Sequence, residues 1–226
     1  MQYQDRKRKF SFDLSNVDLN KIRLLILNKK LLPARKILLD SIDQQFYIID
    51  RLGIKNLKDL LYVLSTKRKI QTFSERSGID IEYLKILKRE AGSYIPKPVK
   101  FQSLTDVDNS IIEKLETINI STNKDLLEHI FSEDELQDLS DSLSIDFYLL
   151  NELLSLSDLS RIPGVGPVFA KILLAAGISS LDDFRNIPPE SILKKANEII
   201  ERDKITKAKL TIKDIEYSKE LSQFLE

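Results

Sequence analysis

The stretch Ser157-Asp-Leu-Ser-Arg-Ile-Pro-Gly-Val-Gly-Pro-Val-Phe-Ala-Lys-Ile-Leu-Leu-Ala-Ala-Gly-Ile-Ser-Ser-Leu-Asp-Asp-Phe184 holds three of the six glycines of the chain. Two of them lie in Pro163-Gly-Val-Gly-Pro167, with no apolar alternation around them. Glycine adopts positive φ readily and lets another backbone approach closely, and Pro167 suits the first position of a helix. The stretch therefore predicts a tight turn between two helices. The second helix would begin with free N–H groups and a partial positive charge, which favour an anion such as phosphate.

The pattern resembles the helix-hairpin-helix motif of DNA-binding proteins. In that motif, successive amides of the turn bind one backbone phosphate and no base is contacted. The resemblance implies that Gly164, Val165 and Gly166 supply these amides, with Val165 pointing inward between the helices. Arg161 and Lys171 are the cations expected to reach neighbouring phosphates. These five residues form the predicted DNA-backbone-binding site.

Two departures from the motif favour a turn that serves only packing. Many DNA-binding members carry a basic or hydroxyl residue directly after the turn, where this chain has Val168 and Phe169. In the equivalent upstream turn, Leu104-Thr-Asp-Val-Asp-Asn109, Asp106 and Asp108 occupy the glycine positions, and their carboxylates would repel a phosphate.

An internal repeat is present with an offset of 66 residues. The segment 54–87 aligns without a gap to 120–153, and eleven of the 34 positions are identical. A third, shorter copy begins at Ile178-Ser-Ser-Leu-Asp-Asp-Phe184. Each copy predicts short helices with capped N-termini, which indicates an internal duplication.

No segment shows convincing period-two alternation, so we predict an all-α protein of tandem degenerate helix-hairpin-helix repeats, built from short helices without a sheet. Two prolines one residue apart in Tyr94-Ile-Pro-Lys-Pro-Val99 favour an extended linker. The predicted parts are an N-terminal arm (1–18), a first helical domain (19–93), a linker (94–102) and a second helical domain (103–226). The second domain would contain a degenerate middle hairpin (103–153), an intact hairpin (157–184) and the C-terminal helices.

Composition excludes several classes of function. The chain has no cysteine, and His129 is its only histidine, so disulfides, cysteine-based zinc sites and histidine-rich metal sites are excluded. DNA glycosylases of this motif class place a lysine soon after the turn, where this chain has Val168. We predict no catalytic residue, metal ligand, cofactor or small-molecule substrate, and therefore no enzymatic activity. Apolar runs are far shorter than the roughly 20 residues that span a bilayer, which favours a cytoplasmic protein without a membrane partner.

Charge is unevenly distributed along the chain. Residues 1–100 carry 22 Lys and Arg against 11 Asp and Glu, whereas residues 101–160 carry 2 against 14. A basic half could meet nucleic acid, and an acidic segment could not. Alternatively, the two regions attract each other within the fold.

The chain from Leu31 to its tail resembles an uncharacterised bacterial family of tandem helix-hairpin-helix proteins, domain of unknown function 4332. The resemblance is carried by four segments: 53–60, 89–98, 156–170 and Thr206-Lys-Ala-Lys-Leu-Thr211. It implies the fold and brings no reaction. Two hypotheses follow, namely weak DNA binding without sequence preference through the Gly164–Gly166 turn, or a protein-interaction scaffold in which the hairpins serve only packing.

Overall fold

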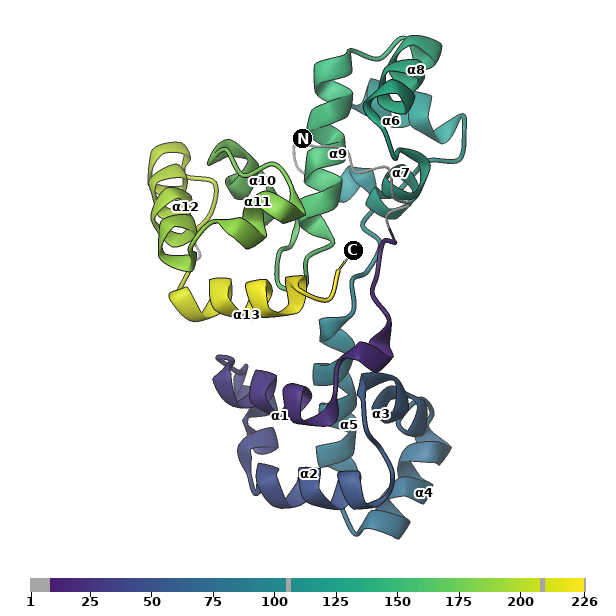
Figure 1. The fold of residues 1–226 in the computed structure, drawn as a ribbon, viewed down its shortest axis with the longest axis vertical. Helices are drawn as coiled ribbons and strands as arrows, with labels where there is room; N and C mark the ends of the chain where they lie inside the picture. Colours follow the sequence, from purple (N-terminus) through teal and green to yellow (C-terminus); the bar gives the residue numbers. More distant parts are fainter. Residues whose placement is uncertain (1–8, 105–106, 208–209, 226) are drawn as a thin grey trace. The chain divides into compact units, whose positions relative to one another are not determined.

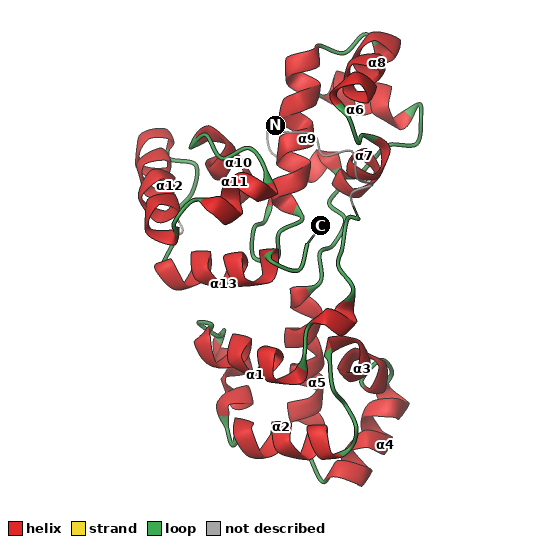
Figure 2. Cartoon of the chain, in the orientation of Figure 1, coloured by secondary structure: helices red, strands yellow, loops and turns green. Residues whose placement is uncertain are grey.

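The computed structural model describes residues 9–104, 107–207 and 210–225 (Figures 1 and 2). This part of the chain is all-helical, as the sequence predicts, and contains no β-strand. Two isolated antiparallel bridges, between Asp18 and Asn56 and between Lys100 and Thr122, are its only extended pairings. None of the described helices combines the length and apolarity that crossing a membrane requires.

The chain divides into two compact units. The N-terminal unit is Phe12–Ile95, and the C-terminal unit is Pro96–Glu226 together with Met1–Ser11. The division between Ile95 and Pro96 lies inside the segment that the prolines mark as a linker. The described part of the segment predicted as an arm is packed into the fold, because Phe10, Phe12 and Val17 are buried. Residues 1–8, which include most of the Arg6–Lys9 cationic run, lie outside the described residues.

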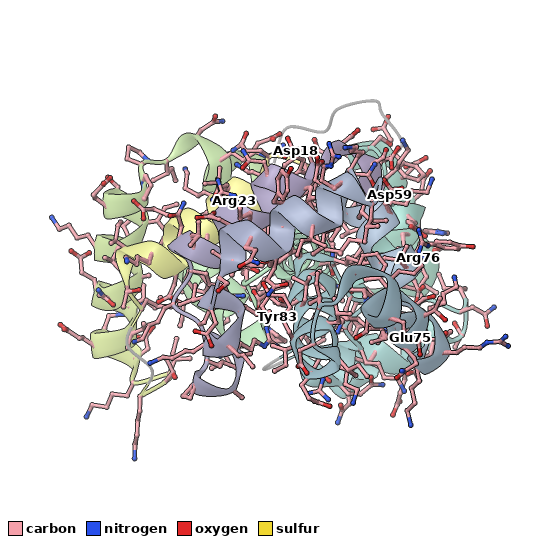
Figure 3. All side chains as sticks on the ribbon, turned by 90° about the horizontal axis from the view of Figure 1, so that it is seen from below. Asp18, Arg23, Asp59, Glu75, Arg76 and Tyr83 are labelled. Atoms are coloured by element: carbon pink, nitrogen blue, oxygen red, sulfur yellow. The ribbon has the colours of Figure 1, made fainter. Side chains whose placement is uncertain are left out.

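In the N-terminal unit, α3, α4 and η2 pack against α5, whose buried side chains include Leu84 and Leu87, while α1 packs against α2. Asp18 caps α1 by accepting a hydrogen bond from the Lys21 amide (2.7 Å). Arg23, which Figure 3 labels together with Asp18, pairs with Asp43 on α2 (2.5 Å). The helical elements of this unit are η1 (Leu14–Asn16), α1 (Leu19–Asn28), η2 (Pro33–Leu39), α2 (Ile42–Arg51), α3 (Leu57–Val63), α4 (Lys67–Ser77), α5 (Ile81–Ala91) and η3 (Gly92–Tyr94).

Glu90, near the end of α5, is a fully buried carboxylate with two cationic partners. Its Oε1 accepts a hydrogen bond from Lys29 Nζ at 3.0 Å, and its Oε2 accepts one from Arg35. Lys29 follows the last residue of α1, and Arg35 lies in η2. One buried acid therefore ties α1 and η2 to α5.

The C-terminal unit begins with the short η4 and centres on the long helix α9. Helix α9 packs against α7, α8 and α10, while α12 packs against α10 and α13. Its elements are η4 (Phe101–Ser103), α6 (Asn109–Glu116), α7 (Asn123–His129), α8 (Glu133–Leu143), α9 (Phe147–Ser160), α10 (Pro167–Ala175), α11 (Leu181–Asn186), α12 (Pro189–Asp203) and α13 (Ile212–Ser222).

Helix bounds and hydrogen bonds recur at the 66-residue offset of the sequence repeat. Helices α3 and α4 correspond residue for residue to α7 and α8. The amides of Leu57 and Asn123 correspond at this offset and both donate to a valine carbonyl in a preceding segment, Val17 at 2.8 Å and Val99 at 2.9 Å. The hydroxyl of Ser74 donates to Ile79 at 2.6 Å, and its counterpart Ser140 donates to Ile145 at the same distance.

Helices α2, α6 and α10, which precede α3, α7 and α11, all end in the same way. Ile54, Ile120 and Ile178 each donate their amide to the carbonyl five residues earlier, the longer bond of a Schellman motif. The residue before each isoleucine, which is Gly53, Asn119 or Gly177, has positive φ.

We predict that Glu90→Gln destabilises the N-terminal unit by about 3 kcal/mol or more, because removing one member of a buried ion pair strands its partners. Urea denaturation followed by circular dichroism measures the loss. The matched control is Glu82→Gln, whose exposed ion pair with Lys85 lies on the same helix and contributes at most about 1 kcal/mol. Equal losses in both variants would contradict the role assigned to Glu90.

Candidate functional site

The Pro163–Pro167 turn is closed by a hydrogen bond from the Val165 amide to the Ile162 carbonyl (2.9 Å). Gly164 has φ +91°, a conformation that side chains disfavour. Proline at the second position and a positive-φ glycine at the third are typical of a type II turn. Val165 is buried, whereas Gly164 and Gly166 are exposed. The glycines thus lie where the sequence predicts, on the surface of a tight turn.

The amides of this turn differ from the expected set of three. The Val165 amide is already bonded to Ile162 within the turn, so it is not available to a ligand. Among the described residues, the amides of Gly164 and Gly166 have no acceptor. Gly166 is the N-cap of α10, and no side chain caps this helix. Two turn amides, together with the start of α10, are therefore open to an anion.

Helix α13 covers one side of the turn. A side chain at Gly164 would clash with Ser218 Oγ, and its Cβ would lie 3.2 Å from the Tyr217 ring. A Cβ at Gly166 would meet no atom within 4 Å. Gly164 is therefore required both by its φ and by its contact with α13, whereas Gly166 is free to accept a side chain.

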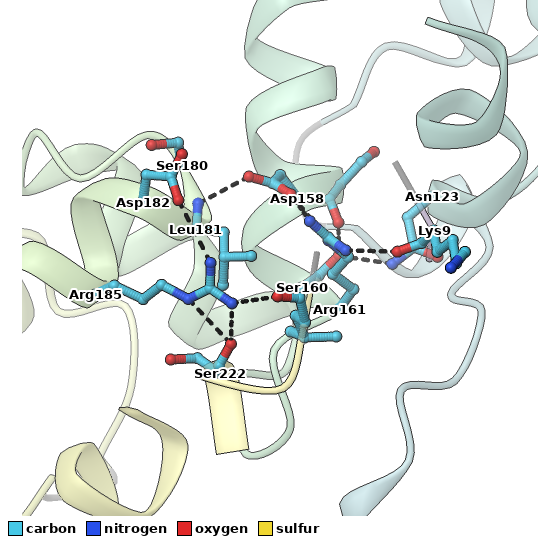
Figure 4. A network of polar contacts seen from close by, with 12 residues as sticks. Lys9, Asn123, Asp158, Ser160, Arg161, Ser180, Leu181, Asp182, Arg185 and Ser222 are labelled. Carbon is cyan, nitrogen blue, oxygen red and sulfur yellow. Dashed lines mark hydrogen bonds and ion pairs between the residues drawn. The ribbon is translucent and has the colours of Figure 1, made fainter. Parts of the chain in front are cut away.

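Arg161 does not occupy the position that the sequence predicts for it. Its side chain is 2% exposed and pairs with the equally buried Asp158 (2.8 Å). Arg161 also donates to the Lys9 carbonyl (2.9 Å), and Asp158 accepts the Leu181 amide of α11 (2.8 Å; Figure 4). Because its guanidinium is held inside this network, Arg161 joins the N-terminal segment, α9 and α11, and its charge is not presented for a phosphate.

Helices α11 and α13 cap each other's C-termini. Arg185 at the end of α11 donates to the Ser222 carbonyl (3.0 Å) and to the Leu225 carbonyl beyond α13. In return, Lys219 on α13 donates to the carbonyls of Phe184 (3.0 Å) and Arg185 (2.8 Å). Burial lowers the pKa of both cations. This exchange fixes α13, and hence the residues that cover Gly164.

Lys171, the second predicted cation, is half-buried on α10. The hydrogen bond from Arg202, with the charges of Arg202 and Lys171, lowers the pKa of the exposed Asp203 carboxyl at the end of α12. The charge of Lys171 therefore interacts with the Asp203 carboxylate of its own unit.

The upstream turn is only partly described, since Thr105 and Asp106 lie outside the described residues. Asp108 caps α6 by accepting the Ser110 amide at 2.8 Å, and this bond lowers the pKa of its carboxyl. A carboxylate used as an N-cap satisfies the amides that would otherwise face an anion.

The sequence did not predict the residues that bind Arg161, anchor α13 to α11 or cover Gly164. These residues are Asp158, Arg185, Tyr217, Ser218 and Lys219. The spacing of three between Asp158 and Arg161 was the one available signal for their ion pair. The described residues contain no cluster of side chains able to hold a metal ion.

The turn and the helices around it fall within a family match. A model described as Domain of unknown function (DUF4332) matches residues 107–219. The chain belongs to this family. The matched range of DUF4332 extends from α6 to most of α13, and so includes the turn together with the helix that covers it. No curated protein and no solved structure matches the chain.

We expect Gly164→Ala to destabilise the protein by about 1–3 kcal/mol, because alanine is strained at positive φ and its methyl group would meet Ser218. Thermal unfolding measures the loss. Adding Ser218→Ala removes the nearest atom and should recover part of the stability, leaving the backbone strain. Full recovery, or none, would show that only one of the two causes operates. Gly166→Ser, at an unobstructed N-cap, serves as the control and should not destabilise.

Asp183 should make unfolding of the C-terminal unit more sensitive to acid. Burial acts to raise the pKa of its carboxyl, but hydrogen bonds from Ser179 and Ser180 outweigh burial and lower it. The ionised carboxylate therefore stabilises the fold above the unfolded pKa of about 3.9, and this stabilisation is lost as pH falls through the lower folded pKa.

Asp183→Asn should accordingly cost stability near neutral pH, and the difference from wild type should shrink below about pH 4. Urea denaturation at several pH values checks this. A constant difference across that range would contradict it. Asp138→Asn, on an exposed position of α8, is the control.

Proposed function

We propose that this chain is a non-enzymatic cytoplasmic module of tandem degenerate helix-hairpin-helix repeats that binds the phosphate backbone of DNA without sequence preference. The observation that carries the proposal is the Gly164–Gly166 turn, because its two glycines are exposed and their amides have no acceptor among the described residues. Backbone N–H groups at the start of a helix form a favourable site for a phosphate.

The proposed contact uses fewer residues than the five that the sequence alone predicts. Gly164 and Gly166 donate to the phosphate, while Val165 holds the turn closed from within. Lys171 is the remaining cation of the predicted set, since Arg161 is engaged inside the unit. A contact with so few charges is weak, and its affinity depends steeply on salt.

A second candidate function is a protein-interaction scaffold. Tyr148 and Leu149, at the start of α9, are 80% and 49% exposed. They follow α8, whose charged residues are all acidic. Exposed apolar side chains beside an acidic helix suit a protein partner with a basic rim. In this alternative, the turn glycines serve only the packing of α10 and α13.

Gly166→Asp and Gly166→Asn form a matched pair that tests the turn. Both side chains suit an N-cap, and a Cβ at this position meets no atom, so both variants should fold. Aspartate adds a negative charge where the phosphate would bind. We expect Gly166→Asp to bind a fluorescent DNA duplex at least about tenfold more weakly than Gly166→Asn, with a salt dependence of log affinity reduced by about 0.9.

Fluorescence anisotropy over a series of salt concentrations gives both quantities. Equal affinity and equal salt dependence in the two variants would reject the turn as the DNA contact. Pull-downs with and without nuclease then address the scaffold alternative, which requires partners that are retained after nuclease treatment.

A further inference from the structure

The two copies of the internal repeat carry opposite charges at one equivalent place. Helices α4 and α8 have the same length and correspond at the 66-residue offset. Their N-caps are Thr66 and Ser132, whose hydroxyls accept equivalent amides at 3.2 and 3.1 Å. The first turn of α4 is Lys67-Arg68-Lys69, whereas the first turn of α8 is Glu133-Asp134-Glu135. One backbone arrangement therefore presents a cationic surface in one unit and an anionic surface in the other.

The acidic version is the one that favours helix formation. Glu135 completes a capping box with Ser132, and carboxylates near a helix N-terminus interact favourably with the helix dipole. Three cations at the same place add to the positive end of the dipole of α4. The need to form the helix thus does not explain Lys67-Arg68-Lys69. Their joint effect is a concentrated positive potential at the junction of α3 and α4.

Neighbouring residues extend this cationic junction, which we define as Tyr62, Lys67, Arg68, Lys69 and Lys88. Lys69 Nζ lies 3.4 Å from the centre of the Tyr62 ring. Lys88, on α5, donates to the Ser65 carbonyl at 2.6 Å, which places a fourth cation at the junction. Tyr62 itself is 67% exposed, so an aromatic ring lies on the surface among these charges.

No described carboxylate forms an ion pair with a cation of the junction. Asp59 accepts the Lys55 amide at the start of α3. Glu90 is fully buried between Lys29 and Arg35, and Glu75 accepts a hydrogen bond from Gln71 further along α4. Lys67 and Arg68 are exposed and make no ion pair with any described residue. Their charges are therefore available to a ligand.

We propose that the cationic junction of the N-terminal unit is a second binding surface for a nucleic-acid backbone, separate from the Gly164–Gly166 turn. Several lysine and arginine charges close together neutralise consecutive phosphates and release counterions. A flexible polyanion satisfies such a group of cations without requiring a shaped pocket. The acidic counterpart at α8 repels the same ligand, so only the α4 copy of this arrangement suits a polyanion. This inference shares with the proposed function the class of ligand, a nucleic acid, and does not depend on the Gly164–Gly166 turn.

The chain itself supplies the substitution that tests this surface. Lys67→Glu, Arg68→Asp and Lys69→Glu together give α4 the first turn of α8, a sequence already compatible with this capped helix. The triple variant should therefore fold. Its control is Lys194→Glu, Lys195→Glu and Lys213→Glu, which changes net charge equally at exposed positions of α12 and α13.

Anisotropy with labelled duplex and single-stranded DNA, across a salt series, gives affinity and salt dependence. We expect the α4 variant to bind at least about tenfold more weakly at low salt. The slope of log affinity against log salt should fall by about 0.9 for each duplex phosphate that the variant no longer neutralises, and by about 0.7 for each single-strand phosphate. The α12 and α13 control should retain most of the affinity. Similar losses in both variants would mean that net charge alone is measured, and would overturn the proposal.

Three further outcomes distinguish the cationic junction from the turn and from self-association. If Gly166→Asp weakens binding and the α4 variant does not, the turn is a DNA contact and the cationic junction is not. If the α4 variant weakens binding while Gly166→Asp matches Gly166→Asn, the junction binds DNA and the turn does not. Sedimentation without DNA tests pairing of α4 with the acidic α8 of a second copy. Self-association that disappears in the α4 variant, with unchanged DNA affinity, would overturn the proposal.

Discussion

Backbone amides at the start of three short helices impose the constraint on which this fold depends. The first-residue amides of α3, α7 and α11 must each find an acceptor. Leu57 and Asn123 donate to the carbonyls of Val17 and Val99 in the segments that enter their repeats. Leu181 differs, because the buried carboxylate of Asp158 accepts its amide. A side chain thus replaces a backbone carbonyl, and Arg161 balances its charge.

The same logic explains how the two larger copies of the repeat differ. Between the bridge residue Asp18 and helix α2, the first copy contains α1 and η2. Between the bridge residue Lys100 and helix α6, the second copy contains only η4. Glu90 binds Lys29 and Arg35 from those additional elements. Its counterpart at the 66-residue offset is Leu156, a buried apolar residue. A buried charge is present where its partners are present, and an apolar residue occupies the position where they are missing.

Local features were predictable from the sequence, and long-range ones were not. Glycine between prolines predicts the turn at Gly164 because positive φ is a property of a few consecutive residues. The alignment of 54–87 with 120–153 predicts equivalent capped helices for the same reason. The full set of contacts that buries Arg161 was not predictable, because the Lys9 carbonyl, one of its partners, lies 152 residues away in sequence. Contact of Gly164 with Ser218 likewise depends on how α13 is anchored, which no local pattern encodes.

The anchoring of α13 bears on both roles of the turn, namely packing and the proposed phosphate binding. Lys219 and Arg185 hold α13 against α11, and α13 fixes one side of Gly164. Packing of α13 against Gly164 favours a fixed direction of its amide, and a preorganised donor loses less entropy on binding. Gly166 experiences no such contact, and its freedom from neighbours leaves access for an anion. Packing and the proposed phosphate binding are therefore compatible uses of one turn, because α13 occupies the side-chain position of Gly164 while the amides of Gly164 and Gly166 have no acceptor among the described residues.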